Sequence, residues 1–318
     1  MLSSYIEKMY REMTFARYDE RDSEFYFSYT GFDGVNMERY SFKNKWGDDL
    51  SAYFYYPEHE IEGRIVIFEH GLGAGHRSYM REIATLVNHG YRVLSYDRTG
   101  CASSPGDGTK GLVASLCDLD YCIRALKSDE KYKSSRISVV GHSWGGFSSM
   151  NIGKFHPDVE HIVAMAGFRS LEAMLMQRMP ALLKYYRPNV YALEEQMNPE
   201  YVTASARDSL SITNSKVLII HSEDDPVVSC KIHFDPLAAQ LRDKENIKFL
   251  KVKNKGHNPN YSDSAVKYLR EYIKISKRKA KKLKTAEQKQ EFINSFDWYK
   301  MTEQDEKIWK QIFALLDS

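Results

Sequence analysis

The sequence predicts an α/β fold in which a mainly parallel, twisted sheet carries helices on both faces. Two observations indicate this class. Short apolar runs of strand length alternate with segments of helical length from residue 64 onward. Two stretches of alternating apolar and polar residues precede them and predict an N-terminal antiparallel hairpin. We therefore expect three parts: an N-terminal helical extension over residues 1–35, a core domain over 36–275, and a basic segment with a C-terminal helix over 276–318.

Composition limits the class of protein. The chain has 318 residues, and its 45 Lys and Arg against 43 Asp and Glu leave a net charge of +2. This balance excludes a global field that gathers nucleic acid, so no nucleic-acid partner is expected. Four scattered cysteines indicate a reducing compartment rather than a disulfide framework. The chain has no secretory leader pattern and no apolar run of the roughly 18 residues that a bilayer span needs, which predicts a cytoplasmic protein without a transmembrane segment.

The expected elements follow in chain order. An amphipathic helix over residues 5–18 opens the extension, and hairpin strands at 36–42 and 50–56 flank a turn at Gly47. The apolar runs, which are typical of strands buried on both faces, lie at residues 64–70, 91–97, 136–140, 161–167, 216–221 and 247–252. The helical segments lie at residues 77–88, 112–128, 145–155, 231–241 and 264–275. Crossover helices between such strands predict parallel pairing.

One long insert, at about residues 168–215, interrupts the alternation. It is rich in Met, Leu and Tyr and contains Pro breaks. One interpretation is a crossover helix with a surface excursion. We favour a short helical lid over a pocket at the strand ends, because long inserts in compact domains are usually functional. Met174, Met179, Tyr185 and Tyr186 are then candidate contacts for an acyl or aromatic group, although Met at helical spacing is equally typical of ordinary packing.

The C-terminal segment has two features. A basic run covers residues 274–284, and a stretch that contains Phe292, Trp298, Trp309 and Phe313 follows it. A solvated helix face or a linker is the interpretation we favour for the basic run, over contact with acidic lipid or RNA. The aromatic residues predict a helix that docks on the rest of the protein. The partner of the basic run and the oligomeric state do not follow from the sequence.

The most informative motif is Gly141-x-Ser143-x-Gly145, which stands between an apolar strand and a helix. A nucleophilic serine must lie clear of the sheet on a sharp strand-to-helix turn, and small residues on both sides let the neighbouring backbone pass. The free amides at the start of the helix favour negative charge that develops there. Ser143 is therefore the candidate nucleophile.

A serine nucleophile needs a base, and the base needs an orienting acid. After this kind of turn, the acid and then the histidine follow the serine along the chain. The loop after the strand at residues 216–221 contains Asp224 and Asp225, and we favour Asp225 because Pro226 and two valines follow it. His257, in a turn just after the next strand, is the candidate base.

A glycine-rich turn after the strand at residues 64–70 predicts an oxyanion hole. The backbone amides of Leu72 and Trp144 would donate to an acyl oxygen. A dinucleotide-binding loop is the rival interpretation, but its fingerprint needs Gly or Ala where this chain has His76. No histidine or carboxylate pattern has metal-ligand spacing, so we expect neither a metal nor a cofactor.

Taken together, these motifs resemble the α/β-hydrolase superfamily, and most of all its lid-bearing esterases, monoacylglycerol lipases and S33-type serine aminopeptidases. The matching stretches are HGLG at 70–73, DRTG at 97–100, GHSWGG at 141–146, EDDPVV at 223–228 and GHNP at 256–259. The resemblance covers about residues 50–275 and departs from the usual pattern at Thr99, Ala102, Ser222 and Ser229. It implies an α/β-hydrolase fold and an acyl-enzyme mechanism carried by Ser143, Asp225 and His257, without a cofactor.

Three functions remain as hypotheses. The first is a serine hydrolase that cleaves carboxylic esters of small or medium acyl groups, with a small-molecule ester as its partner. The second is a serine aminopeptidase of the same fold, which needs a carboxylate in the lid to hold a substrate ammonium. Glu194 and Glu195 are the available residues. The third is a non-catalytic binding protein, against which the complete set of Ser, Asp and His argues.

Overall fold

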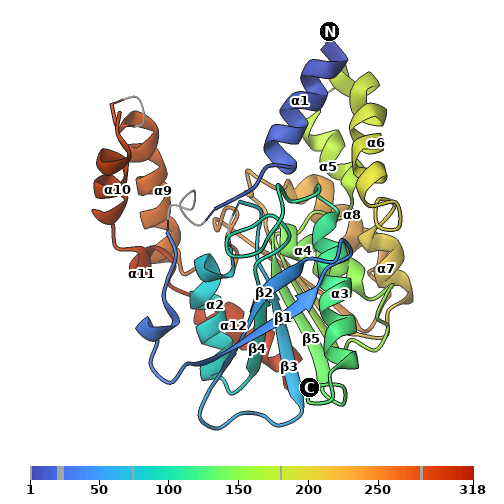
Figure 1. The fold of residues 1–318 in the computed structure, drawn as a ribbon, viewed down its shortest axis with the longest axis vertical. Coiled ribbons are helices and arrows are strands. Elements are labelled where there is room, and N and C mark those ends of the chain that lie inside the picture. The colour runs from blue at the N-terminus through green and yellow to red at the C-terminus, as the bar shows by residue number, and fades with distance from the viewer. Residues whose placement is uncertain (1, 20–24, 74, 180, 280–281) are drawn as a thin grey trace.

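The computed structural model describes residues 2–19, 25–73, 75–179, 181–279 and 282–318, and its centre is an eight-stranded sheet with helices around it (Figure 1). The strand order is β1-β2-β4-β3-β5-β6-β7-β8. An antiparallel hairpin of β1 (Asn36–Lys43) and β2 (Asp49–Tyr56) forms one edge, and β2 also pairs antiparallel with β4. The other neighbouring pairs are parallel. The predicted fold class is confirmed.

The remaining strands begin at or within one residue of the apolar runs that predicted them. They are β3 (Arg64–Glu69), β4 (Arg92–Tyr96), β5 (Arg136–His142), β6 (His161–Met165), β7 (Lys216–Ser222) and β8 (Ile247–Val252). β6 ends two residues earlier than expected, because Ala166 has a φ of 50° and so leaves the extended conformation.

Helices cover both faces of the sheet, which explains why the strand sequences are continuously apolar. The covering helices are α2 (Met80–Asn88), α3 (Ala114–Ser128), α4 (Trp144–Ile152), α8 (Cys230–Gln240) and α12 (Glu306–Leu316). In β3, Ile65 and Ile67 join the apolar cluster that includes α3, α4 and α8. Val66 and Phe68 join the cluster on the opposite face, with α2 and α12. Alternate side chains thus enter two separate cores.

The insert between β6 and β7 is helical. Its described elements are α5 (Leu171–Arg178), the 3-10 turn η4 (Ala181–Tyr186), α6 (Arg187–Met197) and α7 (Ala206–Ile212). α7 packs against α4 and α8 as a crossover helix does, whereas α5 and α6 stand above the sheet beside the N-terminal helix α1 (Leu2–Thr14) (Figure 1).

The C-terminal elements divide into an arm and a docked helix. The arm consists of α9 (Asp263–Lys279), α10 (Ala286–Asn294) and α11 (Trp298–Met301), packed around Tyr272 and Phe292. α12 returns to the sheet and buries Trp309 and Ile312 beneath it. Two further 3-10 turns are η2 (Tyr29–Gly31) and η3 (His76–Tyr79). None of the helices in the described ranges is both long enough and apolar enough to cross a bilayer.

Candidate active site

Ser143 lies on the sharp turn between the end of β5 and the start of α4. Its backbone has a φ of 56° and a ψ of −110°, a region that costs a residue other than glycine about 1–3 kcal/mol. A Cβ on Gly145 would overlap the carbonyl group of Glu69, and a Cβ on Gly141 would overlap that of Gly145. Both glycines are therefore required for the chain to pass this close to itself. The turn holds the serine at the carboxyl edge of the sheet.

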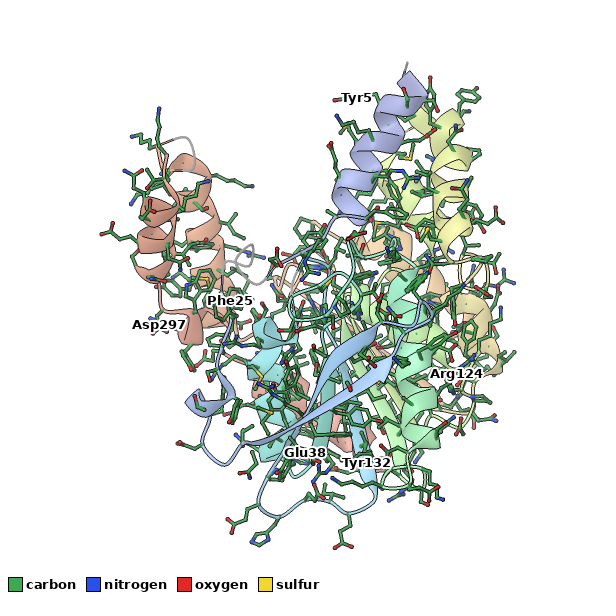
Figure 2. All side chains as sticks on the ribbon, viewed as in Figure 1. Tyr5, Phe25, Glu38, Arg124, Tyr132 and Asp297 are labelled. Atoms are coloured by element: carbon green, nitrogen blue, oxygen red, sulfur yellow. The ribbon has the colours of Figure 1, made fainter. Side chains whose placement is uncertain are left out.

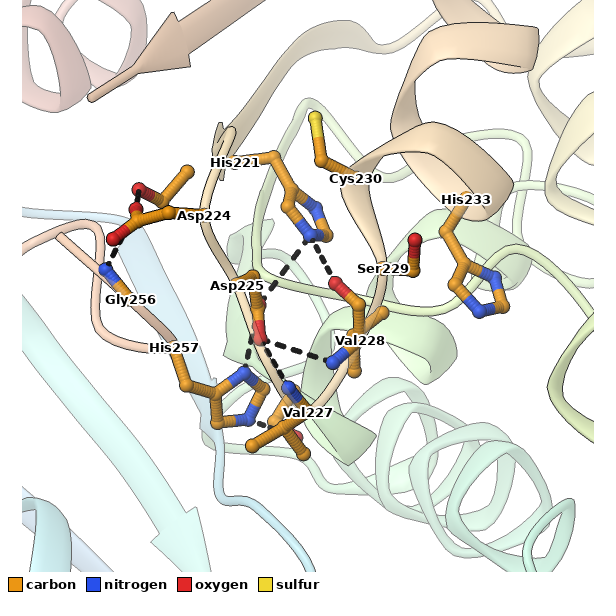
Figure 3. A network of polar contacts seen from close by, with 12 residues as sticks. His221, Asp224, Asp225, Val227, Val228, Ser229, Cys230, His233, Gly256 and His257 are labelled. Atoms are coloured by element: carbon orange, nitrogen blue, oxygen red, sulfur yellow. Dashed lines mark hydrogen bonds and ion pairs between the residues drawn. The ribbon is translucent and has the colours of Figure 1, made fainter. Parts of the chain in front are cut away.

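Ser143, His257 and Asp225 come together although they are distant in the sequence. Oγ of Ser143 lies 2.9 Å from Nε2 of His257. Nδ1 of His257 lies 2.8 Å from Oδ2 of Asp225 (Figure 3). Because the carboxylate accepts the hydrogen on Nδ1, Nε2 is left to accept the serine proton. The three residues follow the parallel strands β5, β7 and β8, whose carboxyl ends meet at one edge of the sheet.

The neighbouring aspartate has a different place. Asp224 accepts hydrogen bonds from Oγ of Ser222 at 2.6 Å and from the amide of Gly256 at 3.1 Å, and it pairs with Arg270 at 2.6 Å. It therefore braces the turn that carries the histidine, while Asp225 contacts the imidazole itself. In the sequence, only the residues that follow the two aspartates favour one of them over the other. In the structure, the two carboxylates point to opposite sides of the loop (Figure 3).

The surroundings of Asp225 keep its carboxylate charged. Its Oδ1 accepts from the amides of Val227 at 2.8 Å and Val228 at 3.0 Å. His221 Nε2 lies 2.8 Å from the Val228 carbonyl oxygen and 3.4 Å from Asp225 Oδ2. Burial alone would raise the pKa of Asp225, but hydrogen bonds from His221, His257 and the Val228 amide hold it far below the usual value of a carboxyl. Asp225 is thus ionised at neutral pH and can stabilise an imidazolium.

A second imidazole supports the backbone of the candidate base. Nε2 of His142 lies 2.7 Å from the carbonyl oxygen of His257, and Nδ1 lies 3.0 Å from the Tyr79 hydroxyl. Since a carbonyl only accepts, Nε2 carries the hydrogen and Nδ1 accepts from the tyrosine. Burial, with the adjacent His257, lowers the pKa of His142 to about 3, so the ring is neutral. No sequence pattern points to this pair, apart from the position of His142 directly before Ser143.

The glycine-rich turn after β3 reaches the same site. A Cβ on Gly71 would lie 3.6 Å from the Cβ of Ser143, and Leu72 lines a cavity together with Ser143 and Trp144. Neither the Leu72 amide nor the Trp144 amide donates a hydrogen bond to another described residue. Both amides are thus free to meet an acyl oxygen.

A buried ion pair that no sequence pattern indicates supports both this turn and the residue after Ser143. The guanidinium of Arg98 donates to Oε2 of Glu69 at 2.6 Å and to the carbonyl oxygen of His70 at 2.5 Å. It also lies 4.5 Å from the ring centroid of Trp144. One side chain therefore contacts the strand end before Leu72 and the residue after Ser143.

A cavity of about 570 Å³ opens beside Ser143 and His257. Its lining is mainly apolar and comes from α1, α5, α6 and the loops after β3, β6 and β7. Arg178 is the one permanently charged side chain among the described lining residues, and no carboxylate belongs to that lining. A cavity of this size and polarity suits an apolar organic group.

Two of the four lid residues named from the sequence line this cavity, and two do not. Met174 and Met179 belong to the lining. Tyr185 is 76% exposed, and Tyr186 packs against the apolar core instead. Neither tyrosine belongs to the described lining of the cavity, and both lie in the 3-10 turn over residues 181–186.

The two glutamates considered for ammonium binding lie outside the cavity lining. Glu194 is fully buried and accepts hydrogen bonds from the Tyr10 hydroxyl at 2.6 Å and from the amides of Leu112 at 2.7 Å and Val113 at 3.2 Å. Glu195 is exposed. Within the described ranges, no group of three or more His, Cys, Asp or Glu could hold a metal ion.

Comparison with curated proteins finds partial matches. A family profile for the alpha/beta hydrolase fold matches residues 64–207. The chain is similar to a proline iminopeptidase of Saccharolobus solfataricus, with 26% identity over 181 residues, 54% of this chain and 56% of the relative. It is also similar to a 2-hydroxy-6-oxo-6-phenylhexa-2,4-dienoate hydrolase of Comamonas testosteroni, with 30% identity over 161 residues, 47% of this chain and 54% of the relative. The chain thus spans about half the length of these curated relatives.

Solved structures match over more of the chain. The Pyrococcus furiosus esterase Pf2001 has a TM-score of 0.60 at 17% identity, with coverage of 84% of this chain and 97% of that chain. Est1E from Butyrivibrio proteoclasticus, solved with ferulic acid bound, has a TM-score of 0.53 at 19% identity, with coverage of 74% and 96%. At such identities the likeness shows a shared fold.

Proposed function

Because this chain belongs to the α/β-hydrolase superfamily, we propose that it is a serine hydrolase that cleaves carboxylic esters of small or medium acyl groups through an acyl-enzyme intermediate. The observation that carries the proposal is the hydrogen-bonded series Ser143, His257 and Asp225 beside an apolar cavity. A serine hydroxyl is a weak nucleophile at neutral pH, and a base within hydrogen-bond distance removes that obstacle.

In the proposed reaction, Nε2 of His257 takes the proton of Ser143 as Oγ attacks the acyl carbon. The carboxylate of Asp225 stabilises the imidazolium, which then gives its proton to the departing alcohol. Water attacks the acyl-enzyme by the same steps and releases the acid. The amides of Leu72 and Trp144 donate to the tetrahedral oxyanion, and the loss of one such donor typically raises the barrier by about 3–4 kcal/mol.

A serine aminopeptidase is the second candidate, favoured by the similarity to the proline iminopeptidase of Saccharolobus solfataricus. The charge of the cavity supports the esterase instead. A substrate ammonium needs a carboxylate, but the described lining offers Arg178 and no Asp or Glu. An apolar acyl group meets no such conflict, because most of the lining is aliphatic or aromatic.

The test combines active-site labelling with a substrate panel. We expect a fluorophosphonate probe to label the wild-type protein but not Ser143→Ala, and the variant to remain folded. We also expect p-nitrophenyl esters to be hydrolysed faster than aminoacyl-p-nitroanilides. Faster turnover of the anilides would reverse the order of the two candidates. A folded wild-type protein that is neither labelled nor active would point to the non-catalytic binding protein.

We also propose a cytoplasmic location and a small-molecule ester as the partner. The four cysteines, Cys101, Cys117, Cys122 and Cys230, are free and buried thiols, which suits a reducing compartment. Fractionation of cells that contain the native protein would test the location directly.

A further inference from the structure

The N-terminal helix α1 contributes a large part of the cavity wall, although it lies outside the residues that match the family profile. Ile6, Met9, Tyr10 and Met13 all line the cavity. These positions are spaced by three or four residues and therefore share one face of the helix. Residues of α5 and α6 line the same cavity, and both helices lie beside α1 (Figure 1).

A buried polar contact ties the middle of α1 to the insert between β6 and β7. The Tyr10 hydroxyl donates to Oε1 of Glu194, on α6, at 2.6 Å. The same carboxylate accepts from the amides of Leu112 and Val113, so α1, α6 and the loop before α3 meet at one fully buried group. Leu112 also lines the cavity. The position of α1 is therefore coupled to the rest of the wall.

The end of α1 is fixed to the core as well. The Thr109 hydroxyl donates to the carbonyl oxygen of Thr14. Just beyond the helix, the Arg17 guanidinium donates to the carbonyl oxygens of Ala102, Ser104 and Gly106 at 2.7–3.0 Å. These anchors hold the base of α1 against the loop after β4 and leave its lining side chains at the cavity.

We propose that α1 is one wall of an acyl-binding site and that Met9 and Met13 determine the length of the acyl chain that the enzyme prefers. This inference rests on the proposed esterase function and assigns a substrate-specificity role to a helix that carries no catalytic residue. The ligand class is an unbranched, uncharged acyl chain of medium length.

The exposure of the two methionines argues for a chain that covers them. Met9 is 43% and Met13 55% exposed, although both belong to an apolar cavity wall. A bound acyl chain would remove this apolar surface from water. Each methylene that becomes buried is expected to raise kcat/KM about fourfold. Methionine is flexible and adapts to chains of different shape, so the preference should extend over several chain lengths.

The experiment uses the full chain and p-nitrophenyl esters from acetate to decanoate. Met9→Trp adds bulk to the wall, and Met13→Trp does so one turn further along the helix. Lys8→Trp is the matched control, because Lys8 lies outside the lining and its side chain is 73% exposed. Tyr5→Trp is a second control, since Tyr5 is 59% exposed on the outer part of α1 (Figure 2).

We expect each methionine variant to lower kcat/KM for the decanoate ester by about tenfold, the loss of nearly two buried methylenes, and to lower it much less for the acetate ester, so that the ratio of the two values falls. Both controls should keep the wild-type profile. An unchanged profile in folded Met9→Trp and Met13→Trp, with ester hydrolysis intact, would overturn the role of α1 and leave the proposed function standing.

If the wild-type protein hydrolyses no ester, the proposed function fails and calorimetric binding of decanoate decides the inference. Binding that Met9→Trp weakens and Lys8→Trp does not would support the acyl wall. No binding, or equal binding by both variants, would overturn it.

Discussion

At the scale of single residues, the site depends on which hydrogen-bond donors each carboxylate accepts from. The carboxylate of Asp225 receives two backbone amides and the imidazole of His257, so each of its oxygens has a donor. The carboxylate of Asp224, one residue earlier, accepts hydrogen bonds from the amide of Gly256 and from the guanidinium of Arg270. Two adjacent and chemically identical side chains thus have different effects on the imidazole.

The first prediction separates these two residues. Asp225→Asn should lower kcat for ester hydrolysis by roughly 10⁴-fold, because an amide in this position disfavours the tautomer in which Nδ1 carries the hydrogen. Asp224→Asn should cause a much smaller decrease, since it keeps the loop near its position and leaves the imidazole contact in place. Steady-state kinetics of both variants check this, and similar losses would contradict the assignment of the acid.

At the scale of elements, a buried carboxylate links α2 to the segments that follow β8 and precede α12. Oε1 of Glu82 accepts from Nδ2 of Asn260 at 2.9 Å and from Nε2 of Gln304 at 3.3 Å. Its other oxygen, Oε2, is buried without a partner among the described residues. Burial raises the pKa of Glu82 to about 7, because the charged form is poorly solvated there.

This shift predicts a pH-dependent stability. The folded protein binds the Glu82 proton more tightly than the unfolded chain. The contribution of this proton to the free energy of unfolding is therefore fully present below about pH 4.3 and is lost as the pH rises through about 7. The side chain of Glu82→Gln resembles the protonated form of the glutamate. Between these two pH values, the free energy of unfolding should therefore fall by about 3 kcal/mol less in the variant than in the wild type. Denaturant unfolding at several pH values measures it, and parallel pH curves for variant and wild type would refute it.

The docked helix α12 gives a second prediction at this scale. Trp309 is 3% exposed and its indole donates to Oε1 of Gln304 at 2.8 Å. Trp309→Ala should lower the free energy of unfolding by about 3–5 kcal/mol and Tm by roughly 10 °C. Phe313→Ala, on the same helix but only partly buried against His89, should cost less. Thermal unfolding compares the two, and equal losses would argue against α12 as a core element.

At the scale of the whole molecule, opposite charges are nearly balanced and interspersed along the chain. The 45 basic and 43 acidic residues leave +2. Of the basic run at residues 274–284, the part that belongs to α9 is largely exposed, and residues 280–281 lie outside the described residues. One of its lysines, Lys279, lies 5.1 Å from the ring centroid of Phe292 and so has a packing contact within the arm. These features favour a solvated face over a nucleic-acid surface.

The corresponding prediction concerns RNA. The protein should not bind single-stranded RNA at about 0.15 M salt, because surface charges are strongly screened at that ionic strength. Fluorescence anisotropy measures the binding. A salt-sensitive rise in anisotropy that Lys277→Gln with Arg278→Gln abolishes would contradict the prediction and give the basic run a partner.

Much of the sheet and of the central turn follows from the sequence alone. Continuous apolar runs predicted the strands because both faces of the sheet are covered, and Gly141 and Gly145 predicted the sharp turn at Ser143 because a Cβ at either position would overlap backbone. The order of strands then predicted that His257 and an aspartate follow at the same edge. These features depend on local conformation and on the pattern of burial, which neighbouring residues encode.

Only the tertiary structure decided which side chains form the cavity. Tyr10 and Glu194 are 184 positions apart, and their contact brings α1 to the site. The support of His257 by His142 and Tyr79, and the exposure of Tyr185, likewise have no counterpart in local sequence patterns. Many sequences allow a helix to form, so local sequence does not say which other segments the helix contacts. Those contacts depend on how whole elements pack, through complementary shape and buried hydrogen bonds.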